Sequence, residues 1–138
     1  QAVCNSFKKE LLDGAHDFDT GGSTFKLAMY TSAANLSAAT TTYTTTSEVG
    51  ASGAYAAGGG VLQSQQTSVA SGVAIVDFAN LSFTGVTITA RGAVIYNSNA
   101  NKQAVAVLDF GSDKTATSGT FTIQFPAYTT AAAILRIS

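Results

Sequence analysis

The clearest hydrophobic pattern in the chain lies between Thr84 and Phe110. It contains three apolar, mostly β-branched runs, at residues 86–89, 93–96 and 104–108. The residues between the second and third runs, 97–102, are small or polar apart from Lys102, and Asn and Ser favour tight turns. The pattern therefore predicts a β-hairpin at 93–108 that another strand precedes in the chain.

Alternating apolar and polar residues predict further strands, at 24–30, 61–69, 73–78, 120–125 and 131–138. In the first of these, Phe25, Leu27 and Met29 would face a core, while Lys26 would lie on a wet or polar face. We expect residues 80–83 to form a turn and residues 111–119 to form a polar loop. Pro126, the only proline, is expected to end the strand before it.

About eight strands follow one another with no helix between them. Parallel pairs need long, usually helical crossovers, so the sheets should be mostly antiparallel. Two packed sheets are the simplest way to bury so many alternating faces. We expect one domain over residues 1–138, a jelly-roll-like β-sandwich with one short N-terminal helix, and a single closed barrel is the alternative.

One short helix is predicted at residues 3–12, with Asn5 or Ser6 as its cap. Phe7 and Leu11 lie one turn apart and would share a face. A helix this short must pack on something to persist. Residues 1–22 are therefore interpreted as a helix or arm that covers one end of the sheet or docks on a neighbouring subunit.

Residues 31–60 are rich in Ala, Thr, Ser and Gly. Tyr43 and Tyr55 are among the few large side chains that could fix this segment to the rest of the fold. From Leu27 to Val76 the only charged side chain is Glu48. Such a long loop is uncommon in a compact domain. It either meanders over the chain's own sheet, with short helical turns at 32–36 and 47–49, or stays uncharged because another subunit covers it.

Composition describes a packed protein with a weakly charged surface. The 138 residues are 46% hydrophobic and 11% charged, with a formal net charge of −1. Net charge near zero does little to keep copies apart, so self-assembly or docking on a partner is expected. The seven Lys and Arg residues are scattered, which gives no basic patch for nucleic acid. No apolar run reaches the roughly 18 residues of a membrane helix. No signal peptide is visible, and because the sequence begins at Gln1 we expect an initiator methionine to be missing or removed.

Few residues suggest catalysis, and we expect no enzyme, metal site or cofactor. Cys4 is the only cysteine and is interpreted as a small buried apolar residue. His16 is the only histidine, and one His beside one Asp gives no catalytic geometry. The remaining acids are interpreted as turn-forming or backbone-bonding residues rather than as calcium ligands or paired catalytic carboxylates, namely Asp13, Asp17, Asp19, Asp77 and Asp109.

Several phrases of the sequence resemble small structural proteins of tailed bacteriophages. They are CNSFKKELL at 4–12, TFKLAMYT at 24–31, EV at 48–49, GAY at 53–55, GG at 58–59, ARGAVIYN at 90–97 and AVLDFG at 106–111. The resemblance runs over nearly the whole chain and concerns the order of the phrases. It implies a virion component and brings no catalytic motif with it.

The resemblance leads us to expect a capsid decoration (cement) protein. Such a chain, made in the bacterial host cytoplasm, would dock on the capsid surface as a homotrimer and stabilise contacts between major capsid subunits. The partner-contact residues we would choose are Phe7 and Leu11 of the arm and Tyr43 and Tyr55 of the loop. A tail or neck component is the first alternative, and a carbohydrate-binding module that uses exposed Tyr residues is the second.

Overall fold

A computed structural model describes all 138 residues. It contains eight strands and one helix, in two antiparallel sheets. The five-stranded sheet has the order β1-β7-β6-β2-β3, and the three-stranded sheet has the order β4-β5-β8. The prediction of a mainly β, antiparallel, two-sheet fold with one short N-terminal helix is therefore confirmed.

A single long hairpin, β6 (Leu81–Asn97) and β7 (Ala104–Ile123), dominates the fold. Its turn falls where the polar residues 97–102 predicted it. The expected turn at 80–83 and the expected loop at 111–119 are wrong, because both segments belong to this ribbon. Their Ser and Thr side chains pair across the two strands instead, as in Ser82–Thr122 and Thr89–Thr115.

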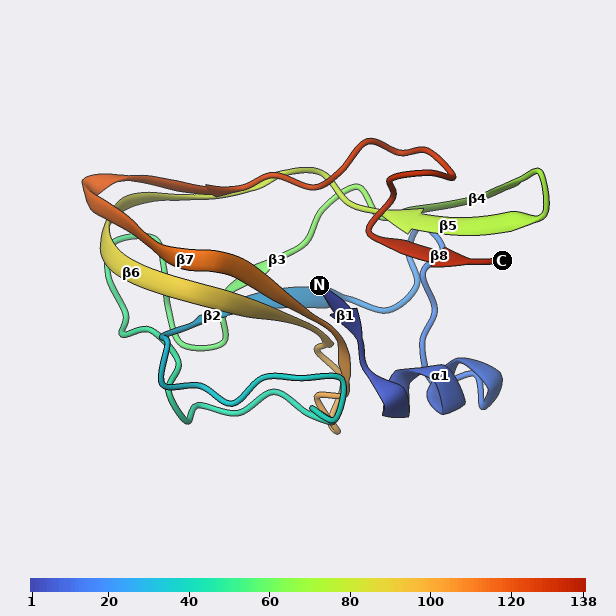
Figure 1. Cartoon of the computed structure of the whole chain (residues 1–138), viewed down its shortest axis with the longest axis horizontal. Coiled ribbons are helices and arrows are strands. Elements are labelled where there is room, and N and C mark those ends of the chain that lie inside the picture. The colour runs from blue at the N-terminus through green and yellow to red at the C-terminus, as the bar shows by residue number, and fades with distance from the viewer.

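The ribbon curls back over itself at the end of the molecule opposite α1 (Figure 1). The pairing register shifts at several points along it, including between Ala90 and Gly92, and such bulges bend a strand pair. The curl folds the ribbon into two layers, and the end of β6 lies in the one that we call the first layer. Phe83 and Val86, from the start of β6, lie in the same buried core as Leu27 and Ile95 of the first layer. The two layers thus share one hydrophobic core.

Strand β2 (Phe25–Tyr30) lies beside β6 in that first layer. Phe25, Leu27 and Met29 are fully buried, as their alternation predicted. The predicted wet face is wrong, because Ala28 and Tyr30 are buried too. The loop after β2 covers this second face: the Val49 backbone N–H donates to the Met29 carbonyl at 3.0 Å, and the Tyr30 hydroxyl donates to the Thr44 carbonyl at 2.6 Å.

Helix α1 spans Asn5–Leu12 and follows the short strand β1 (Ala2–Val3). Its N-cap residue is Cys4, and no side chain caps it, so the predicted Asn5 or Ser6 cap is wrong. The Asn5 backbone N–H, at the first position of the helix, donates to the Ala38 carbonyl at 2.8 Å, which pairs one of the N–H groups that a helix start leaves without an intrahelical acceptor. Cys4 is fully buried, and burial raises the pKa of its thiol to about 11.

The strand predicted at 61–69 divides into β3 (Gly60–Val61) and β4 (Gln66–Ala70), one in each sheet. Strand β5 (Val73–Asp77) lies at the centre of the smaller sheet, and β8 (Leu135–Ile137) forms its other edge. Strand β8 is shorter than predicted because residues 129–133 form a hydrogen-bonded turn. Helix α1 lies at the same end of the molecule as this sheet (Figure 1), and it is too short to cross a membrane.

Candidate functional site

Glu48 is the centre of the long loop over residues 31–59. Its carboxylate accepts hydrogen bonds from the Tyr43 hydroxyl at 2.6 Å, the Tyr55 hydroxyl at 2.7 Å and the Gly58 backbone N–H at 2.8 Å. The aromatic ring of Tyr55 lies in the core, where it packs edge-on against Phe83. The Glu48 carboxylate therefore holds three parts of the loop together. The structure fits the hypothesis that the loop meanders over the chain's own sheet.

Four tyrosine hydroxyls lie in or beside this Glu48 cluster. Burial is the main cause that raises the pKa of Tyr30 and Tyr96 to about 12. Burial, together with the hydrogen bond to Glu48, also raises the pKa of Tyr43 and Tyr55 above the ordinary tyrosine value. The folded chain thus opposes ionisation of all four phenols.

This arrangement predicts a loss of stability at alkaline pH. A group whose pKa is raised on folding contributes its full stabilisation below its unfolded pKa, about 10 for tyrosine, and loses it as the pH rises toward the folded value. We expect the urea midpoint to fall between about pH 10 and 12, the upper value being the pKa of Tyr30 and Tyr96. Urea titrations at several pH values, with tyrosinate absorbance as a second signal, measure this. A midpoint that is constant while the phenols ionise would contradict it.

The four residues chosen as partner contacts divide into two classes. Phe7 is 3% exposed and Tyr55 is 1% exposed, so both pack in the chain's own core, although Phe7 also lines a groove beside α1. Their role as partner contacts stays a prediction. Leu11 and Tyr43 are half-buried. Tyr43 stacks on Tyr96 with ring centroids 4.7 Å apart. Among the five tyrosines only Tyr128 is exposed, at 36%, so they form no open aromatic platform for a sugar.

His16 joins the helix to the hairpin turn. Its Nε2 lies 2.8 Å from a Glu10 carboxylate oxygen, and its Nδ1 lies 3.1 Å from the Asn97 side-chain nitrogen. The imidazole is buried and contacts the rings of Phe7 and Phe25. Both ring nitrogens are already used, so the arrangement holds α1 in place and leaves no nitrogen to take a proton from a substrate.

Four of the five aspartates predicted to form turns or bind backbone do bind backbone N–H groups, and the fifth, Asp13, pairs with Lys9 instead. Asp17 accepts from the Asp19 N–H, Asp77 from Phe78, and Asp109 from Gly111. The bond from Gly111, with the nearby Arg91 guanidinium, lowers the pKa of Asp109. These residues organise turns and strand ends.

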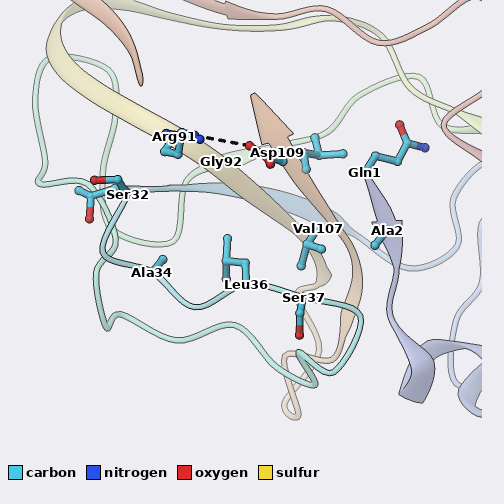
Figure 2. Close-up of a pocket in the computed structure, with 12 residues that line it drawn as sticks. Gln1, Ala2, Ser32, Ala34, Leu36, Ser37, Arg91, Gly92, Val107 and Asp109 are labelled. Carbon is cyan, nitrogen blue, oxygen red and sulfur yellow. Dashed lines mark ion pairs between the residues drawn. The ribbon is translucent and has the colours of Figure 1, made fainter. Parts of the chain in front are cut away.

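One surface pocket of about 410 Å³ lies between the N-terminus, the loop and the hairpin (Figure 2). Gln1 and Ala2 border it on one side, Ser32 and Leu36 on another, and an Arg91–Asp109 ion pair with atoms 3.6 Å apart lies at its edge. The two charges compensate each other, and no nucleophile with an adjacent base lines the pocket.

A second feature, which sequence reasoning missed, is an apolar surface at the α1 end of the molecule. We name it the end face and define it by Leu12 of α1, Val69 of β4, Ala74 of β5 and Ile137 of β8. Leu12 is 91% exposed, Val69 70% and Ile137 57%, the three highest values among the large hydrophobic residues. Val69 pairs with Ala74 and Ala74 with Ile137, so these three side chains lie on the same side of the small sheet.

The end face continues into a groove of about 540 Å³ between α1 and the small sheet. Nine of the eleven residues that line the groove are hydrophobic, and the other two are Lys8 and Arg136. Exposed apolar surface with a polar rim is a common feature of interaction sites. The end face is thus the strongest candidate interaction site of the chain. Comparison with known proteins adds no relative, since neither a family model, nor a curated protein, nor a solved structure matches the chain.

Proposed function

We propose that the chain is a structural protein of a phage virion, a capsid decoration protein that docks on the outer shell and stabilises contacts between major capsid subunits. The observation that carries the proposal is the end face, an exposed apolar surface on a molecule with 11% charged residues and a net charge of −1. Such a surface suits a protein that works by docking. The resemblance of the sequence phrases to phage structural proteins supports the same class.

The mechanism of such a protein is additive. Each copy contributes a modest interface, and many copies together oppose the outward pressure of packed DNA. A rigid body transmits that load better than a flexible one. The Glu48 cluster and the curled β6–β7 ribbon provide rigidity, because they fasten the long loop and both layers to one core. Homotrimers at local threefold positions are the assembly we propose.

Fractionation of purified virions tests the proposal. We expect the chain in DNA-filled heads, at a constant ratio to the major capsid protein, and absent from isolated tails. Recovery from tails alone would contradict the proposal and favour a tail or neck component. A sixfold or twelvefold ring in solution would favour that alternative as well.

A further inference from the structure

The charges around the end face show which kind of partner fits it. Lys8 and Arg136 line the groove, and no acidic side chain does. The two acids of α1 and its end have other partners: Glu10 lies 2.8 Å from the His16 imidazole, and Asp13 pairs with Lys9. Lys8 is exposed and has no carboxylate partner within ion-pair distance. The groove is therefore apolar, and the charged residues that line it are both cations.

This charge pattern opposes pairing of two end faces in a twofold dimer. In a twofold interface the same patch lies on both subunits, so the Lys8 ammonium groups of both copies would lie at one interface. Like charges brought together at an interface cost free energy, and the patch contains no acid to offset them. A different surface, with the opposite charge, suits the groove better.

We infer that the end face binds an apolar segment that carries carboxylates, supplied by the major capsid protein. The inference rests on the proposed function and adds the surface, its orientation and the chemistry of the partner. Leu12 and Ile137 would insert among the partner's apolar side chains, and Lys8 would meet a carboxylate at the edge. Helix α1 would then lie against the shell, and the curled end of the β6–β7 ribbon would point away from it (Figure 1).

A fatty acid shares this chemistry, since it too joins an apolar chain to a carboxylate. Val69 on the outer strand β4 is exposed, lies on the same side of the sheet as Ala74 and Ile137, and is outside the groove lining, so the apolar surface is wider than the groove. That width favours a protein segment. Binding of a fatty acid is kept as an outcome of the experiment.

The experiment measures binding of the full chain to phage heads assembled without it, by co-sedimentation. The variants that we call end-face variants are Leu12→Ser, in the end face itself, and Lys8→Glu, in the groove that continues it. Both positions are exposed, so folding should be preserved. Their matched controls are Val61→Ser, at an exposed apolar residue of β3, and Lys114→Glu, at an exposed cation of β7. We expect each end-face variant to weaken binding at least about tenfold and each control to change it less than about twofold. Added salt should weaken binding of the unmodified chain more than that of Lys8→Glu.

The other outcomes overturn the inference in distinguishable ways. Tight binding of the unmodified chain with no effect of either end-face variant would refute the end face and leave the proposed function standing. No binding of the unmodified chain would refute both. Dissociation of a homo-oligomer by Leu12→Ser in analytical ultracentrifugation, with head binding unchanged, would assign the surface to a second copy. Saturable oleate binding that Lys8→Glu abolishes, again with head binding unchanged, would assign it to a lipid.

Discussion

Replacing Glu48 with alanine is expected to lower the free energy of unfolding by about 3–5 kcal/mol, because a charged acceptor is removed from partly buried donors. The substitution leaves the Tyr43 and Tyr55 hydroxyls and the Gly58 N–H without their shared acceptor. Tyr55 is 1% exposed, so water cannot readily replace the carboxylate there. Urea unfolding followed by circular dichroism measures the change.

Single hydroxyl deletions provide the graded control for this prediction. Tyr43→Phe removes one donor and leaves the carboxylate two others, so we expect a loss of about 1 kcal/mol. A Glu48→Ala protein within about 0.5 kcal/mol of the unmodified chain would show that the loop is held by its apolar contacts alone.

Gly59→Ala is expected to destabilise the chain by more than about 3 kcal/mol, because strained backbone and a steric clash combine. Gly59 has a φ of +79°, and a Cβ there would lie 1.7 Å from the Leu27 carbonyl oxygen. That oxygen belongs to the backbone of β2, which is paired with β6 on one side and β3 on the other, and it cannot move aside cheaply. The thermal midpoint and the urea midpoint should both fall.

Gly72→Ala separates the two causes. Gly72 has nearly the same φ, +78°, but a Cβ there meets nothing within 4 Å. We expect this variant to lose only the cost of the left-handed conformation, about 1–2 kcal/mol. Equal losses in the two variants would mean that the loop moves away from β2 without penalty, contrary to the close contact described above.

The sequence predicted those elements whose local signals agree with one another. The β-branched runs at 93–96 and 104–108, with a polar turn between them, were enough to place the central hairpin. Residues 80–83 and 111–119 of the ribbon region were mistaken for a turn and a loop, because their Thr and Ser residues bury little and gain their stability from pairing across the strands. No local pattern reports that pairing.

The candidate sites were less accessible to sequence reasoning. Glu48 carried a usable signal, since a lone acid in a fifty-residue uncharged stretch should have partners if it is buried. The end face carried almost none, because Val69 and Ile137 belong to two strand segments that lie far apart in the sequence. Only the register of β4, β5 and β8 brings them to one side of a sheet, beside Leu12.

The copy number of the chain per virion tests the proposed function most directly. Quantitative mass spectrometry of purified particles, with the major capsid protein as the internal reference, gives this number. A decoration protein that occupies repeated positions on the shell should be present on the order of hundreds of copies. About a dozen copies, or none, would contradict the proposal that this chain docks on the capsid surface.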